Sequence, residues 1–304
     1  MIRLRTLAAG VAGAWLAWRI AGPETTPRYP PRQERPLRLP GRSVFVGERE
    51  FFVRETGPAD APTIVLIHGW SLDGEMTFHR IIPELARRFR VVVPDLRNHG
   101  RSDWIRSSFS VDDLAADVAG VLDAVGVRQA TVVGSSLGGV VAEVRALSHP
   151  RFVRRLVLAG TAARPIDQLR VAAWFGMRAT RAIARISRHE LSYATTTVVR
   201  RGGGIGPEHV RWMWEGLMRR DPALFYEAGF AAWRFDNRRM VGRIDVPTMV
   251  IIPTADQVVP SRTQYELASL LDEPEVVELH GARHESVLSQ PTAYIEAIGR
   301  FAAG

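Results

Sequence analysis

The chain has 304 residues, and its 40 basic residues, all of them arginine, outnumber 32 acidic ones to give a formal net charge of +8. It has no cysteine, which excludes a disulfide framework, a cysteine-bound zinc and a thiol nucleophile, and no lysine, which excludes a lysine Schiff base. No module that reads nucleic acid is recognisable, so the positive charge predicts no nucleic-acid partner. The length suits one α/β core with an insertion.

Residues 1–22 form an apolar segment with arginines near both ends. Its large side chains fall on one stripe of a helix: Leu4, Leu7, Val11, Trp15 and Trp18. The apolar stretch has about 17 residues, against the roughly 20 that a bilayer-spanning helix needs, and no signal-peptide cleavage pattern follows it. We expect this segment to associate with a membrane; spanning the bilayer, lying on its surface and being cleaved off all stay open.

Residues 23–40 are rich in proline and arginine, which is typical of an extended, semi-rigid linker. Residues 161–243 are also basic, with fifteen arginines against seven acidic residues. A basic tail and a basic insertion suit an anionic membrane surface. The arginines after the apolar segment favour the cytoplasmic side for the domain that follows them. We therefore expect a membrane-associated protein, with the side left open.

The rest of the chain predicts an α/β fold. Runs that read as strands alternate with helical stretches over residues 41–160, and the alternation resumes over residues 244–304. The expected strands are 43–46, 50–55, 63–67, 91–94, 129–133, 249–252 and 276–279, and residues 111–125 have a helical period. Continuous apolar runs are typical of parallel strands that are buried on both faces. Residues 161–243 break the alternation and predict a helical insertion between the two parts of the core.

A Gly-x-Ser-x-Gly motif stands at residues 134–138, directly after the apolar run 129–133 and before a helix-forming stretch. A strand that leads through this motif into a helix predicts a tight turn with the middle serine exposed at its tip. Ser136 has glycine at both the −2 and the +2 position, and Ser135 does not. The motif therefore indicates Ser136 as a nucleophile.

Two partners for that serine follow later strands. Asp256 lies four residues after the run 249–252, and His284 lies five residues after the run 276–279. A serine hydroxyl is a weak nucleophile until an imidazole takes its proton, and the imidazole needs an acceptor to fix its tautomer. The chain order is therefore serine, aspartate, histidine. Glu285, adjacent to His284, is the rival to Asp256.

From about residue 42 to residue 304 the chain resembles the α/β-hydrolases, in particular the esterase, lipase and non-haem peroxidase branch. The resemblance implies an α/β-hydrolase fold: a mostly parallel, doubly wound sheet in residues 41–160 and 244–304, with residues 161–243 as a helical cap. It places the nucleophile at Ser136, the acid at Asp256 and the base at His284, and it implies no metal or organic cofactor.

The resemblance also implies an oxyanion hole. The backbone N–H of Leu137, directly after the nucleophile, is one expected donor. The other is the N–H of Trp70 in the stretch His68-Gly69-Trp70-Ser71, which follows the strand 63–67; Ser71 is the alternative. His99 is expected to order a loop beside the site.

These features predict a serine hydrolase that cleaves carboxylic esters through an acyl-enzyme. A perhydrolase or acyltransferase with the same triad, and a catalytically idle binding module, are the alternatives. The insertion is dense in bulky apolar residues, including the cluster Trp212-Met213-Trp214, which predicts a pocket for a hydrophobic or lipid-like substrate. Head group, acyl length and oligomeric state stay open.

Overall fold

The computed structural model describes residues 37, 39–166, 170–186, 188–221 and 223–304. The apolar segment 1–22 and nearly all of the linker 23–40 therefore lie outside the described residues. Among the helices within these ranges, none combines the length and the apolar character needed to cross a membrane.

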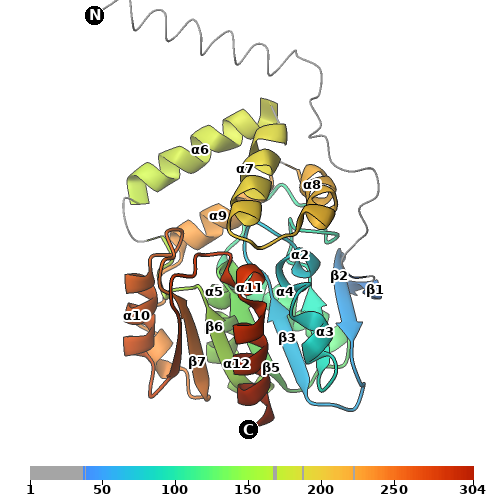
Figure 1. The fold of residues 1–304 in the computed structure, drawn as a ribbon, viewed down its shortest axis with the longest axis vertical. Coiled ribbons are helices and arrows are strands. Elements are labelled where there is room, and N and C mark those ends of the chain that lie inside the picture. The colour runs from blue at the N-terminus through green and yellow to red at the C-terminus, as the bar shows by residue number, and fades with distance from the viewer. Residues whose placement is uncertain (1–36, 38, 167–169, 187, 222) are drawn as a thin grey trace, which may run out of the picture.

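The core is a single sheet of eight strands in the order β1-β2-β4-β3-β5-β6-β7-β8 (Figure 1). The first two strands pair antiparallel with their neighbours, and the remaining strands run parallel to one another. The predicted fold class is confirmed. The strands are β1 Gly41–Val46, β2 Arg49–Thr56, β3 Thr63–Ile67, β4 Arg90–Pro94, β5 Ala130–Ser135, β6 Val153–Ala159, β7 Thr248–Pro253 and β8 Glu275–Leu279.

The sheet is apolar on both faces, which explains why its central strands read as continuous apolar runs. In β3, Val65 and Ile67 belong to one buried cluster, whereas Ile64 and Leu66 belong to another. Successive side chains of a strand point to opposite faces, so each cluster marks one side of the sheet. The helices beside the sheet are α2 Gly74–Phe78, α3 Ile82–Leu85, α4 Val111–Ala124, α5 Leu137–Ser148, α10 Ser261–Leu270, α11 Ser286–Ser289 and α12 Pro291–Ala303.

Each face has its own set of helices. α4, α5 and α10 contribute to the cluster with Val65, and α2, α3, α11 and α12 contribute to the cluster with Ile64. Burying apolar surface on both faces stabilises the layers by about 25 cal/mol per Å². The arrangement leaves the carboxyl ends of the parallel strands free to carry side chains of the site.

In the part that the structure describes, four α-helices follow β6 and precede β7, and they lie above the carboxyl edge of the sheet (Figure 1). They are α6 Arg170–Ile186, α7 Arg188–Arg201, α8 Val210–Met218 and α9 Phe225–Arg234. We call this part, residues 161–243, the helical insertion. It covers the edge at which the expected site residues follow their strands.

Candidate active site

A strained turn joins β5 to α5 and carries Ser136. The φ angle of Ser136 is 54°, a region that residues with a side chain rarely adopt. A Cβ atom on Gly138 would lie 2.0 Å from the carbonyl oxygen of Ile67, and one on Gly134 would lie 2.3 Å from that of Gly138. Both motif positions therefore require glycine, because the backbones approach too closely for any side chain.

Ser136, His284 and Asp256 lie in one hydrogen-bonded line. The Nε2 atom of His284 is 3.0 Å from the Ser136 hydroxyl, and its Nδ1 atom is 2.8 Å from Oδ2 of Asp256. An Nδ1–H that donates to the carboxylate leaves the Nε2 lone pair facing the serine. The carboxylate has no exposed surface, and it rather than the rival Glu285 is the partner of the imidazole.

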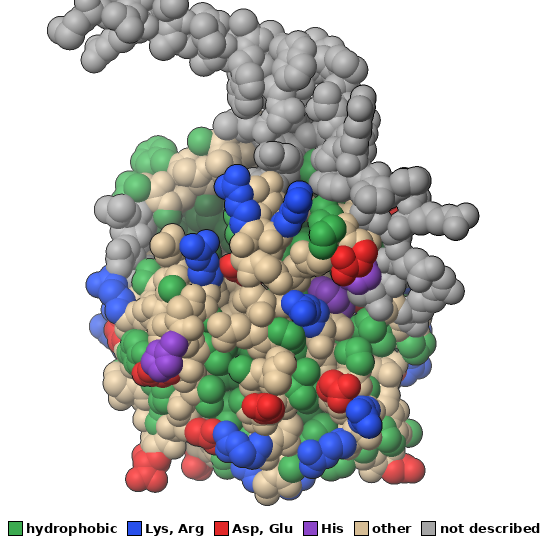
Figure 2. All heavy atoms as spheres, in the orientation of Figure 1, with side chains coloured by type: hydrophobic (Ala, Val, Ile, Leu, Met, Phe, Trp, Pro, Cys, Tyr) green, Lys and Arg blue, Asp and Glu red, His purple; other side chains and the backbone are tan. Residues whose placement is uncertain are grey.

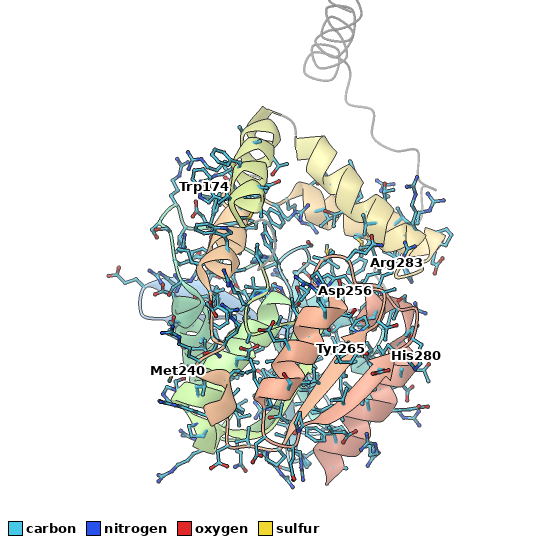
Figure 3. All side chains as sticks on the ribbon, turned by 90° about the vertical axis from the view of Figure 1, so that its left-hand side faces the viewer. Trp174, Met240, Asp256, Tyr265, His280 and Arg283 are labelled. Carbon is cyan, nitrogen blue, oxygen red and sulfur yellow. The ribbon has the colours of Figure 1, made fainter. Side chains whose placement is uncertain are left out.

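The carboxyl ends of three strands supply these side chains. Ser136 follows β5, Asp256 follows β7 and His284 follows β8, and neighbouring parallel strands end at the same edge of the sheet. In Figure 3 Asp256 lies at this edge beneath the helical insertion, whereas Tyr265 of α10 lies further down. The line of hydrogen bonds can move a proton from the serine to the imidazole.

Two backbone segments flank the serine. Leu137 is the first residue of α5, where an N–H has no acceptor within the helix and the helix dipole favours negative charge. Residues 68–71, which we call the oxyanion loop, lie on the other side: a Cβ on Gly69 would be 3.1 Å from Cβ of Ser136. Trp70 follows directly in that loop. Backbone N–H groups of α5 and of the oxyanion loop can therefore approach an oxyanion that forms beside Ser136 from two sides.

Two buried histidines support the oxyanion loop. Nε2 of His68 accepts the N–H of Leu96 at 2.9 Å, so Nδ1 carries the proton and donates to the carbonyl of Gly69 at 2.7 Å. Nε2 of His99 lies 2.6 Å from the carbonyl oxygen of Trp70. Burial lowers the pKa of His68 to about 4 and that of His99 to about 3, because it disfavours the charged imidazolium.

The helical insertion contacts the oxyanion loop from above. The indole N–H of Trp70 donates to the carbonyl of Phe225 at 2.7 Å, and the two rings stack with centroids 5.1 Å apart. Arg220 donates to the carbonyl of Ser71 at 2.9 Å and lies over the Phe225 ring. Burial lowers the pKa of Arg220 to about 10, so the guanidinium stays charged at neutral pH. The insertion thereby restrains the loop that carries an expected oxyanion donor.

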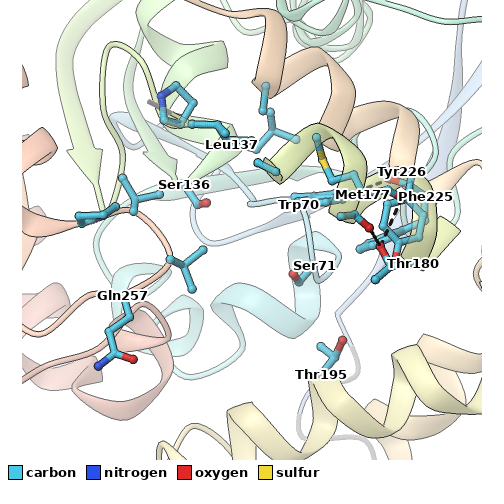
Figure 4. A pocket seen from close by; sticks show the side chains of 18 of the residues that line it. Trp70, Ser71, Ser136, Leu137, Met177, Thr180, Thr195, Phe225, Tyr226 and Gln257 are labelled. Atoms are coloured by element: carbon cyan, nitrogen blue, oxygen red, sulfur yellow. Dashed lines mark hydrogen bonds between the residues drawn. The ribbon is translucent and has the colours of Figure 1, made fainter. Parts of the chain in front are cut away.

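A cavity of about 610 Å³ opens beside Ser136 (Figure 4). Its walls come from the oxyanion loop, α5, α6, α7, α9, α10 and the segments after β6 and β7, and most of their side chains are apolar. Its lining includes Trp70, Leu137, Ile166, Met177, Phe225, Tyr226, Val258 and Val259. Figure 2 shows the surface hollowed beside α6, with hydrophobic side chains in the hollow. The cavity is large enough for a small ester with an apolar acyl group.

The expectation that the Trp212-Met213-Trp214 cluster faces a substrate pocket is wrong, since none of these three residues lines the cavity. Trp212 and Met213 are buried in the same apolar cluster as Met76 and Phe78 of α2, where they pack α8 onto the core. The cavity walls include small residues of α6 that no sequence pattern marks: Ala173 and Gly176.

Within the described ranges, no group of three histidine, aspartate or glutamate side chains is close enough to hold a metal ion.

Residues 62–291 match the family model described as the alpha/beta hydrolase fold. The chain belongs to the α/β-hydrolase family. The resemblance drawn from its sequence is therefore confirmed.

Named relatives of this α/β-hydrolase include enzymes. It is 30% identical to a non-heme chloroperoxidase of Streptomyces lividans, over 79% of this chain and 91% of that one. It is also 30% identical to a pimeloyl-[acyl-carrier protein] methyl ester esterase of Aeromonas hydrophila, over 79% and 95%. Other curated relatives are 39% to 40% identical over shorter stretches, and the chain spans only 36% to 42% of their length. A hydrolase structure from Pseudomonas aeruginosa superposes with a TM-score of 0.76 at 26% identity, covering 87% of this chain and 98% of that one.

Proposed function

We propose that this α/β-hydrolase cleaves carboxylic esters with hydrophobic acyl groups through an acyl-enzyme on Ser136. One observation carries the proposal: the hydrogen-bonded line from Asp256 through His284 to Ser136 ends at the wall of a mostly apolar cavity. The relative named as a methyl ester esterase supports ester chemistry.

Acylation begins with attack of the Ser136 oxygen on the ester carbonyl carbon. The hydroxyl proton passes to Nε2 of His284, and the ionised Asp256 stabilises the resulting imidazolium. The N–H groups of Leu137 and Trp70 stabilise the negative charge on the former carbonyl oxygen. As the carbon–oxygen bond to the alcohol breaks, the imidazolium returns its proton to the leaving alkoxide, and the acyl group stays on the serine.

Deacylation repeats these steps with water. His284 takes a proton from a water molecule as the water oxygen attacks the acyl carbon, and it gives that proton to the Ser136 oxygen as the acid leaves. A peroxide or an alcohol that reaches the acyl-enzyme in place of water would accept the acyl group instead. The acceptor therefore decides between hydrolysis and transfer.

A fluorophosphonate probe and a panel of p-nitrophenyl esters of graded chain length test the proposal. The wild-type protein should be labelled and should hydrolyse the esters, and Ser136→Ala should lose both properties. Ser135→Ala is the matched control and should be labelled at the wild-type rate. Labelling that survives in Ser136→Ala, or is lost equally in both variants, would contradict Ser136 as the nucleophile. Hydrogen peroxide or an alcohol added to the assay shows which acceptor the acyl-enzyme prefers.

We also propose that residues 1–22 hold the enzyme at a membrane, with the catalytic domain on the cytoplasmic side. The tryptophan-bearing apolar stripe and its flanking arginines support this, as does the proline-rich stretch that follows them. Removal of residues 1–40 should move the protein from the membrane fraction to the soluble fraction and leave hydrolysis of soluble esters unchanged. A full-length protein that is found in the soluble fraction would contradict the proposal.

A further inference from the structure

The carboxylate of Asp256 receives four hydrogen bonds. Its Oδ1 atom accepts the N–H groups of Val258 and Val259 at 2.8 and 3.0 Å. Its Oδ2 atom accepts Nδ1–H of His284 at 2.8 Å and, in addition, a bond from the side chain of Gln264, whose Nε2 atom lies 3.0 Å away. Gln264 therefore contacts the same oxygen as the imidazole.

The amide of Gln264 can have only one orientation. The side chain is fully buried on α10, and its Nε2 atom also donates to the carbonyl of Val259 at 2.7 Å. Both neighbours of Nε2 are acceptors only, so a reversed amide would place Oε1 against two oxygens. Both N–H groups of the amide are thus committed, one to the carboxylate of Asp256 and one to the backbone.

These two bonds tie α10 to both ends of the segment 256–259. Asp256 at its start binds the imidazole, and Val258 and Val259 at its end line the cavity. A carboxylate with donors on both oxygens cannot rotate without breaking several bonds. Donors also stabilise its charge, because hydrogen bonds to an ionised group are stronger than those between neutral groups.

We propose that Gln264 is a positioning residue for the reaction proposed above. It holds Asp256 in the rotamer that directs Oδ2 at His284, and it acts on Ser136 only through these two residues. The proposal rests on the proposed function, in which Asp256 fixes the tautomer of the imidazole and stabilises the imidazolium.

Two substitutions at this position distinguish a positioning role of Gln264 from a role in packing alone. Gln264→Met keeps the volume and removes both donors, and it should lower kcat for p-nitrophenyl acetate about 10- to 100-fold, the loss expected for a hydrogen bond to a charged group. KM should stay within about twofold, because the lost interaction matters most when the imidazolium forms. Gln264→Glu is closer in shape but should be worse than Gln264→Met, since it sets a second carboxylate against Oδ2. Leu267→Met, equally buried on α10 but in the apolar core, is the control and should keep wild-type kcat.

A second readout needs no substrate. The Nδ1 proton of His284 should give a strongly deshielded signal in the proton NMR spectrum, and Gln264→Met should shift it whereas Leu267→Met should not. Unchanged kcat in Gln264→Met, a change in KM alone, or an unshifted signal would each overturn the inference. A wild-type protein that neither binds the fluorophosphonate nor cleaves any ester would contradict the proposed function instead, and the NMR shift would still decide the role of Gln264 in holding Asp256.

Discussion

Glu143 links the stability of the fold to pH, and its replacement by glutamine tests that link. The side chain lies on α5 with no exposed surface, and burial raises its pKa from 4.5 to about 8. The Asn237 amide donates to Oε2 at 3.0 Å and offsets part of this effect, because the bond favours the charged form. The native state therefore keeps the proton at neutral pH, whereas the unfolded chain releases it above about pH 4.5.

The direction of the effect follows from proton binding. Between these two pKa values the native state binds more protons than the unfolded state, so Glu143 makes stability fall as the pH rises, by about 1.4 kcal/mol per pH unit. From pH 5 to pH 7 this loss amounts to about 2 to 3 kcal/mol. Glutamine has no proton to release and keeps an oxygen for Asn237, so Glu143→Gln should remove the loss.

Urea unfolding curves of both proteins at several pH values measure this difference. The free energy of unfolding of Glu143→Gln, minus that of the wild type, should grow by about 2 to 3 kcal/mol from pH 5 to pH 7. His68 and His99 act in the opposite direction, since their lowered pKa values make stability fall as the pH drops below about 6.5. Both proteins share that contribution, so it cancels. A difference that stays constant across this range would refute a buried, neutral Glu143.

Four other substitutions test separately the turn at Ser136, the cavity wall, the packing of α8 and the contact between the helical insertion and the oxyanion loop. Gly138→Ala should abolish fluorophosphonate labelling, because its Cβ would lie 2.0 Å from a carbonyl oxygen; wild-type labelling would mean that the turn can widen. Met177→Ala should lower kcat/KM for octanoate esters more than for acetate esters, since lost contact costs about 25 cal/mol per Å². Trp212→Ala should lower the melting temperature and leave that chain-length profile unchanged, and the opposite pattern would place Trp212 at the substrate. Arg220→Met should lower kcat roughly tenfold at constant KM for acetate esters, because the Ser71 carbonyl loses a charged donor; unchanged kcat would show that the loop needs no such restraint.

Local backbone chemistry explains what the sequence could predict. The turn around Ser136 needs glycine at positions 134 and 138, so its motif is visible without any structure. Buried parallel strands need apolar side chains on both faces, so seven of the eight strands and their order in the chain are also visible. β6 is not predicted from the sequence, because its first half carries two arginines and so lacks a continuous apolar run. The fold class follows from the turn and the seven strands, since the residues of each of these elements are themselves enough to predict it.

The cavity walls and the support of the acid could not be predicted in this way. Which face of α6 turns toward Ser136 depends on how the insertion packs, and a bulky side chain such as Trp212 is buried wherever an apolar partner lies nearby. Gln264 lies eight positions after Asp256, in the first turn of α10. The path of the chain between them brings the Gln264 side chain back to the Asp256 carboxylate. Nothing in its immediate neighbours marks that contact.

The two ends of the helical insertion meet. The backbone N–H of Asn237 donates to the carbonyl of Ala163 at 2.8 Å, and the Asn237 side chain is held in turn by Glu143 of α5. The chain between these two points therefore starts and ends at neighbouring positions of the core, and α8 and α9 also pack onto the core. Such a segment can be exchanged as a cassette: residues 164–236 of a relative with another ester preference could be recombined onto this core without changing the strands that carry the serine, the aspartate and the histidine. Under the function proposed above, such an exchange would keep the serine, the aspartate and the histidine and would replace the part of the cavity wall that α6, α7 and α9 supply.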